Sequence, residues 1–144
     1  MATKISFQVK DIPPKKDGAN SMWGKQTEIP RLISLRSSAL MAMDGRIPFN
    51  HNITLKLKFH CPSNKIFRVG DLDNFITGVC DGLQAADPRA EGTAIWAKEA
   101  PPEIQPNECI AILDDCYVVQ ILAEKVGNDS NRYWYEIELE GEWT

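Results

Sequence analysis

The sequence predicts a single α/β (α+β) domain in which helices pack on one mixed β-sheet. Its 144 residues are 43% hydrophobic and 25% charged, as in one ordinary globular domain. Stretches that alternate apolar and polar residues are typical of strands, and stretches with apolar residues at helical spacing separate them. No apolar run reaches the roughly 18–20 residues of a membrane helix, which excludes a bilayer-spanning role.

The first part of the chain predicts a strand, a loop and a helix. Residues 4–10 alternate polar and apolar side chains and predict the first strand. Residues 11–28 contain prolines and glycines and predict a long loop. Pro30 stands at a first helical position, and the apolar residues that follow at helical spacing predict a helix that ends at Gly45.

The clearest strand covers residues 53–59. Its odd-numbered residues are apolar and its even-numbered ones polar, so one face meets the core and the other, with Lys56 and Lys58, is wet and cationic. With basic residues of the loop regions, these lysines form a predicted phosphate-contacting set, for which a solvated strand edge is the alternative. The set comprises Lys15, Lys16, Lys25, Lys56, Lys58 and Arg68.

The next part of the chain predicts a helix, a mixed segment and a short strand. Asp73 is a candidate N-cap for a helix over residues 74–84. Residues 85–108 are longer than most structureless loops, so we expect them to be functional, partly helical or packed on a neighbour. Residues 109–113 are apolar and predict a short strand.

The chain closes with extended segments. Residues 118–126 are extended or partly helical, because their periodicity does not decide between the two. A turn at residues 127–131 leads to a closing strand over residues 133–139. The order βαβαββ, with hairpin-like closing strands, indicates a mixed sheet with helices packed on it.

Charge is divided between the two halves of the chain. Residues 1–70 carry twelve basic and four acidic residues, a net charge of +8, whereas residues 71–144 carry four and sixteen, a net charge of −12. This asymmetry is compatible with a phosphate-facing half and a metal-binding half. The start of the chain lacks the basic-then-apolar layout of a secretory signal, so we expect a cytoplasmic protein.

The four cysteines are expected to be small buried residues. A reducing compartment disfavours a disulfide scaffold. A zinc site built from His60, Cys61, Cys109 and Cys116 is the alternative, although the paired short spacings of structural zinc are missing.

The most informative residues are Asp71, Asp73, Asn74, Asp114 and Asp115. Two aspartates two residues apart in extended backbone project from one face, and a second acidic pair at the end of a neighbouring strand could complete a cation site. Mg²⁺ suits few carboxylates, several waters and a substrate phosphate. The structural alternative, which spacing alone favours, is that Asp73 only caps a helix and Asp114-Asp115 only form a turn.

A family resemblance adds to this interpretation. The run Arg68-x-x-Asp71-Leu72-Asp73-Asn74, then Asp81-Gly82-Leu83, then Asp114-Asp115 and Lys125, resembles the RusA family of Holliday-junction resolvases. The segment Ile12-Pro13-Pro14, followed by Asn20 and Trp23, is similar to the proline-rich first loop of that family. The resemblance covers most of the chain except residues 85–108.

The resemblance implies a small homodimeric α/β endonuclease of DNA recombination and repair. It would bind four-way or branched DNA and nick two opposing strands symmetrically with Mg²⁺ or Mn²⁺. Carried over by position, Asp71, Asp73 and Asp115 would be the catalytic, metal-binding carboxylates, and Asp114 would assist them or orient a water. Asn74 would hold the loop or hydrogen-bond a carboxylate. The supporting residues are Asn74, Thr77, Asp81 and Lys125.

The sequence departs from the family pattern at Thr77. The family usually has a lysine there, and a lysine near the scissile phosphate stabilises the charge of the transition state. Thr77 has no charge, so either another cation (Lys125, Arg68 or Lys65) substitutes, or the protein cleaves slowly or not at all. The second departure is the segment at residues 85–108, which is longer than the connection expected there. Trp96 in this segment is expected at a dimer contact, at DNA or in the core.

Two other functions stay open at this point. One is a catalytically weak or inactive module of the same fold that binds branched DNA, with Thr77 as its signature. The other is a protein-interaction domain without nucleic-acid contacts, whose acidic second half keeps it in solution.

Overall fold

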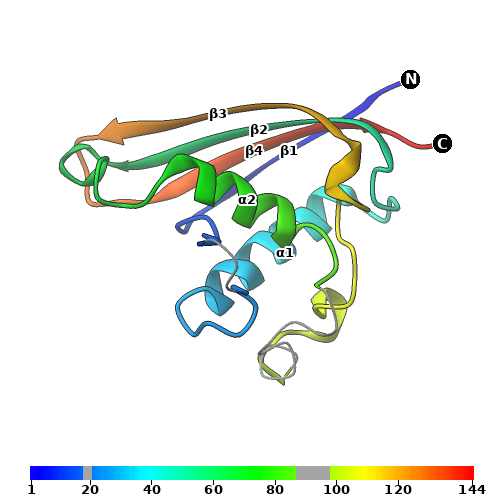
Figure 1. The fold of residues 1–144 in the computed structure, drawn as a ribbon, viewed down its shortest axis with the longest axis horizontal. Coiled ribbons are helices and arrows are strands. Elements are labelled where there is room, and N and C mark those ends of the chain that lie inside the picture. The colour runs from blue at the N-terminus through cyan, green and yellow to red at the C-terminus, as the bar shows by residue number, and fades with distance from the viewer. Residues whose placement is uncertain (18–20, 87–97) are drawn as a thin grey trace.

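The computed structural model describes residues 1–17, 21–86 and 98–144 (Figure 1). It is one small domain with a four-stranded mixed sheet and two helices packed on it, which confirms the predicted fold class. None of the helices in the described ranges is long and apolar enough to cross a membrane. The strands are β1 (Thr3–Val9), β2 (His51–Pro62), β3 (Val118–Asn128) and β4 (Trp134–Glu142), and the helices are α1 (Ile29–Met43) and α2 (Leu72–Gly82).

The sheet order is β1-β4-β2-β3. β4 runs antiparallel to both β1 and β2, and β3 runs parallel to β2 through the α2 crossover. The expectation of hairpin-like closing strands is therefore wrong. Pro62 pairs with Asn128 of β3, and His60 pairs with Trp134 of β4. The turn after β3 therefore crosses the end of β2, and β4 pairs with the opposite edge of β2.

Both helices pack on the same face of the sheet (Figure 1). The alternation predicted for residues 53–59 is confirmed, because every odd-numbered residue of β2 from Ile53 to Cys61 is buried. The apolar stripe of α1 packs on these residues and on the buried face of β4. That face of β4 carries Tyr135, Ile137 and Leu139, and the buried stripe of α1 carries Leu35, Ala39 and Met43.

The ends of α2 differ from the prediction. Its N-cap is Asp71 and not Asp73, because the Asp71 carbonyl accepts the first helical hydrogen bonds, from the amides of Asn74 (3.1 Å) and Phe75 (3.3 Å). Asp73 lies in the first turn, where a negative charge favours the helix dipole. The helix ends at Gly82, two residues earlier than predicted.

The segments around β3 also differ from the prediction. Residues 109–113 form no strand beyond a single bridge between Phe49 and Ile112. The amides of Ile110, Ala111 and Ile112 converge instead on the carbonyl of Leu83, at 3.1 to 3.3 Å, and these bonds hold the segment at the end of α2. The ambiguous residues 118–126 are extended and lie within β3.

The cysteines agree with the prediction in part. Cys61 and Cys80 are buried, whereas Cys109 is half-buried and Cys116 is exposed, and all four are free thiols. Cys116 lies in a short turn before β3 that faces solvent, which is why it is not a core residue. Residues 87–97 of the 85–108 segment, which include Trp96, lie outside the described residues.

We expect Tyr135→Phe to leave the free energy of unfolding unchanged or to raise it by about 1 kcal/mol. The Tyr135 hydroxyl is fully buried and has no hydrogen-bond partner among residues 1–17, 21–86 and 98–144. Burial, and then the charge of Asp11, raise the pKa of this hydroxyl well above its usual value. Chemical denaturation measures the change, with Tyr117→Phe as the control. A loss of more than about 1 kcal/mol would mean that an ordered water satisfies the hydroxyl.

Candidate functional site

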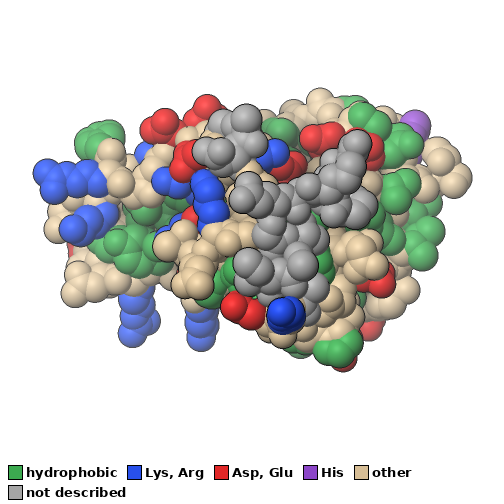
Figure 2. All heavy atoms as spheres, turned by 60° about the horizontal axis from the view of Figure 1, so that its bottom comes forward, with side chains coloured by type: hydrophobic (Ala, Val, Ile, Leu, Met, Phe, Trp, Pro, Cys, Tyr) green, Lys and Arg blue, Asp and Glu red, His purple; other side chains and the backbone are tan. Residues whose placement is uncertain are grey.

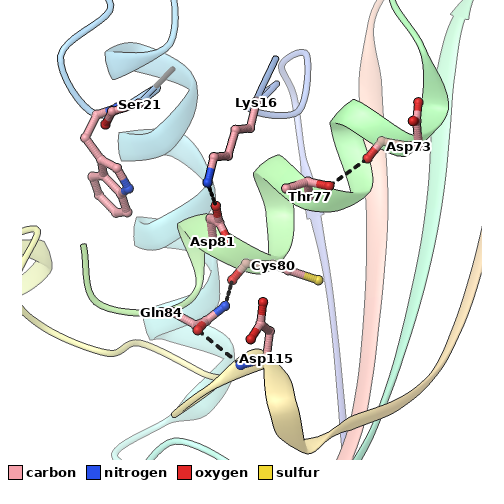
Figure 3. A network of polar contacts seen from close by, with 9 residues as sticks. Lys16, Ser21, Asp73, Thr77, Cys80, Asp81, Gln84 and Asp115 are labelled. Atoms are coloured by element: carbon pink, nitrogen blue, oxygen red, sulfur yellow. Dashed lines mark hydrogen bonds and ion pairs between the residues drawn. The ribbon is translucent and has the colours of Figure 1, made fainter. Parts of the chain in front are cut away.

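One side of α2 carries a row of polar side chains. Asp73, Thr77 and Asp81 follow one another at four-residue steps, so they lie along neighbouring turns of the helix (Figure 3). The Thr77 hydroxyl donates to the backbone carbonyl of Asp73 at 3.0 Å. The hydroxyl is thus bound to the helix itself, and the row contains two carboxylates with a neutral residue between them.

Asp115 approaches this row at the C-terminal half of α2. Its side chain points toward the helix next to Cys80 and Asp81 (Figure 3). The backbone amide of Asp115 donates to Gln84 Oε1 at 3.1 Å, and Gln84 Nε2 donates to the Cys80 carbonyl at 2.9 Å. Gln84, which the sequence analysis does not single out, therefore fixes the position of Asp115 against α2.

The carboxylates around Asp115 influence one another. Burial, the hydrogen bond and charge of Asp114, and the charge of Asp81 raise the pKa of Asp115. Asp114 has the opposite shift, because its carboxylate caps the next turn and accepts from the Cys116 amide at 2.9 Å, which lowers its pKa. Burial, Asp81 and Asp115 raise the pKa of the Cys80 thiol to about 12, so this thiol is protonated at neutral pH and is no nucleophile.

The structure separates the predicted carboxylates into two groups. Asp71 and Asp73 lie at the N-terminal end of α2, whereas Asp115 lies beside Asp81 near the other end (Figure 3). At a rise of about 1.5 Å per residue, Asp73 and Asp81 are about 12 Å apart along the helix axis. Across the described residues, no group of three or more His, Cys, Asp or Glu side chains is arranged to hold a metal ion.

The donor chemistry still fits Mg²⁺ at the acidic pair, which we define as Asp81 and Asp115. Carboxylate oxygens are the ligands Mg²⁺ prefers, and one or two of them suffice when water and substrate phosphate supply the rest. The Asp81 charge is one of the causes that raise the pKa of Asp115, and a bound cation would offset it. Among the described residues the four carboxylates inferred from the sequence do not come together, whereas Asp81 and Asp115 lie beside each other within reach of solvent.

A loop from the N-terminal part of the chain lies along α2. The Lys16 amide donates to the Asn74 carbonyl at 3.1 Å, and the Asn74 side chain donates to Asp17 at 2.8 Å. Gly78 allows this approach, because a Cβ there would overlap the carbonyl oxygen of Pro14. Asn74 therefore holds this loop, through its backbone carbonyl and through the hydrogen bond of its side chain to the Asp17 carboxylate. The Lys16 ammonium reaches Asp81 Oδ2 at 2.9 Å.

Lys125 does not lie at the acidic pair. Its ammonium donates to the carbonyls of Ile66 at 2.8 Å and Gly70 at 3.1 Å. These carbonyls belong to the loop that ends at Asp71, so Lys125 positions the loop at the N-terminal end of α2. Phe67 is 95% exposed in the same loop, and Lys65 and Arg68 beside it are also exposed.

The face of the sheet opposite to the helices is not cationic, contrary to the prediction. Lys56 and Lys58 point out from β2, but Lys56 pairs with Glu138 at 3.2 Å and Lys58 pairs with Glu124 at 3.5 Å. The acidic partners come from β4 and β3, whose places beside β2 follow from the sheet order and not from local sequence. This face is a mixed-charge groove, and its lysines are poor candidates for phosphate contacts.

A buried arginine holds the segments around the acidic pair together. Arg36 of α1 is fully buried and donates to the carbonyls of Gly82 and Gln84, each at 2.7 Å. It also donates to carbonyls on the segment that leads to Asp115: Ile104 at 3.2 Å, Gln105 at 2.7 Å, and Glu108. Burial lowers its pKa to about 10. The only signal in the sequence for this role of Arg36 is that a basic residue stands inside the apolar stripe of α1.

Searches of family models and of curated proteins find no match to the chain. The evidence for function therefore comes from the chemistry of the site.

Proposed function

We propose that this protein is a metal-dependent, structure-selective DNA endonuclease that resolves Holliday junctions by symmetric nicking. The observation that carries the proposal is the acidic pair, Asp81 of α2 and Asp115 from the turn before β3, with the Lys16 ammonium beside it. Burial, and then the nearby carboxylates of Asp114 and Asp81, raise the pKa of Asp115, so its ionised form disfavours the folded state, and such groups cluster at functional sites.

The residues of the chain would have separate roles in this reaction. Asp81 and Asp115 would hold Mg²⁺, which supplies an activated water and positive charge at the phosphodiester. Gln84 orients Asp115 through its backbone amide, and the Asp114 carboxylate stabilises the turn that carries Asp115. Asp71 and Asp73 would lie on the path of the DNA, at the end of α2 next to the exposed loop.

The exposed loop before α2 offers chemistry for nucleic acid. Lys65 and Arg68 are cations that bind phosphates, and Phe67 presents an aromatic ring on which an unpaired base can stack. Figure 2 shows Lys and Arg side chains gathered at the end of the molecule where this loop lies. A branched DNA with unstacked bases fits such a surface better than a continuous duplex does.

Symmetric nicking requires two sites, so the proposal includes a homodimer. β3 is an edge strand with one neighbour, β2, in the sheet of the described residues. It exposes Val119 (65%), Leu122 (50%) and Ile121 (41%), and it contains no proline that would protect the edge. An antiparallel pairing of β3 with β3 of a second copy would cover these side chains.

We expect the double variant Val119→Lys, Leu122→Lys to weaken self-association by at least about tenfold, because like charges opposite each other destabilise strand pairs. Sedimentation equilibrium at several concentrations measures the effect. Met41→Lys, at an exposed position of α1, is the matched control and should leave self-association unchanged. A dimer that survives the double variant would place the interface elsewhere.

Cleavage of a labelled synthetic four-way junction, with and without Mg²⁺, tests the activity. Paired nicks at symmetric positions that require Mg²⁺ would support the proposal, and linear duplex of the same sequence is the control substrate. Junction binding without cleavage would favour the inactive binding module. Neither binding nor cleavage, together with a melting temperature that ignores Mg²⁺, would favour the interaction domain.

A further inference from the structure

We infer that Lys16 is the cation that contacts the scissile phosphate at the acidic pair. The helix α2 itself has the neutral Thr77 one turn before Asp81 and so does not supply this charge. This inference rests on the proposed nuclease function and identifies the residue that carries positive charge at its site. The main observation is the Lys16–Asp81 ion pair of 2.9 Å, one helical turn beyond Thr77 (Figure 3).

Lys16 is held in place by its own loop. Its amide binds the Asn74 carbonyl, the neighbouring Asp17 binds the Asn74 side chain, and Pro14 lies against Gly78. The Lys15 amide adds a hydrogen bond of 2.8 Å to the buried Glu28 carboxylate. The loop is therefore fixed on both sides of Lys16, and a fixed cation loses little entropy when it binds a ligand.

The other basic residues considered for this role do not contact the acidic pair. Lys125 donates to two backbone carbonyls at the N-terminal end of the helix. Lys56 and Lys58 pair with glutamates on the opposite face of the sheet. Lys15 pairs with Asp17 at 3.6 Å, away from Asp81. Among the side chains that the structure describes, Lys16 is the basic residue with an ion pair to the acidic pair.

The chemistry of the ammonium suits this role. A lysine has three N–H donors, and the hydrogen bond to Asp81 engages one of them. The Lys16 side chain is about one-third exposed, so a phosphate oxygen can reach the other donors from solvent. Lys16 forms no covalent bond and transfers no proton. It stabilises the negative charge that develops on the phosphate as water attacks.

Moving the charge tests the inference. Lys16→Gln should lower the Mg²⁺-dependent rate of junction cleavage by about a hundredfold or more. Junction affinity should change less than threefold, because under the proposed function the exposed loop with Lys65, Phe67 and Arg68 contacts the DNA independently of Lys16. In the double variant Lys16→Gln, Thr77→Lys, a lysine four residues before Asp81 can reach the same carboxylate, so we expect at least a tenfold recovery of the rate.

Lys10→Gln, at an exposed position in the same part of the chain, is the control and should keep more than a third of the wild-type rate. A full rate in Lys16→Gln, an equal loss in Lys10→Gln, or no recovery in the double variant would overturn the inference. Melting temperatures of all variants show whether a loss of rate comes from unfolding. If the wild type does not cleave, the proposed function fails as well, which distinguishes that outcome from a failure of Lys16 alone.

Discussion

Asp115→Asn is expected to lower Mg²⁺-dependent junction cleavage by at least about a hundredfold and at the same time to raise the melting temperature at pH 7. Burial and the nearby carboxyls of Asp114 and Asp81 raise the pKa of Asp115 in the folded protein. The stability that its protonated form contributes is fully present below the unfolded-state pKa and is lost as the pH rises through the raised folded-state pKa. At neutral pH the ionised carboxylate therefore disfavours folding, and asparagine removes that effect.

The gain in melting temperature should therefore depend on pH. It should be largest at neutral pH and should shrink as the pH falls through the raised folded-state pKa toward the unfolded-state value of about 4. Thermal melts of both proteins from pH 3 to pH 7 measure this dependence. A lower melting temperature of Asp115→Asn at pH 7, or an unchanged rate of cleavage, would remove Asp115 from the site.

Asp114→Asn is the matched control in the adjacent position, with the opposite sign. The Cys116 amide lowers the pKa of Asp114, so its ionised form favours folding above the unfolded-state pKa, and that contribution is lost as the pH falls through the lowered folded-state value. Asp114→Asn should lower the melting temperature slightly at pH 7.

Asp73→Asn, at the other end of α2, distinguishes the two sets of carboxylates. It abolishes cleavage if the carboxylates inferred from the sequence carry the reaction, and it retains most of the activity if the acidic pair carries it.

Local pattern predicted the elements of this fold well. The alternation of residues 53–59 identified both the strand and its buried face, and Pro30 and Gly45 identified the ends of α1 closely. These signals are local, because the side-chain period and the terminal residues determine them. The boundaries of α2 were less certain, since Asp71 and Asp73 are both good residues for the start of a helix.

Long-range placement could not be predicted from the same patterns. No local signal shows that β4 lies between β1 and β2, and the glutamates that neutralise Lys56 and Lys58 follow from that placement. In the same way, the division of the predicted aspartates between the two ends of α2 depends on how the chain returns to β3. Gln84 has no motif, because its role comes from one contact across 31 positions.

Arg36→Met is expected to lower the free energy of unfolding by about 3–5 kcal/mol, a large part of the 5–15 kcal/mol typical of a domain. The guanidinium donates to five backbone carbonyls from two segments and lies over the Trp23 ring at 5.2 Å. Methionine fills a similar volume but donates no hydrogen bond, so it leaves those carbonyls without their donor. Each unsatisfied buried acceptor costs about 1–3 kcal/mol.

Arg36→Lys separates charge from hydrogen-bond geometry, because lysine keeps the charge but has three donors instead of a planar five-donor fork. We expect it to lose about half as much stability as Arg36→Met. Arg46→Met, at an exposed position just after α1, is the control and should change stability by less than about 0.5 kcal/mol. Urea denaturation followed by tryptophan fluorescence measures all three variants, and if Arg36→Met does not fold, Arg36→Lys provides the comparison. Equal denaturation midpoints for Arg36→Lys and wild type would show that the planar geometry of the guanidinium is dispensable.

Through its guanidinium, Arg36 of α1 connects the end of α2 to the segment that leads to Asp115. The acidic pair therefore depends on a side chain that does not touch it.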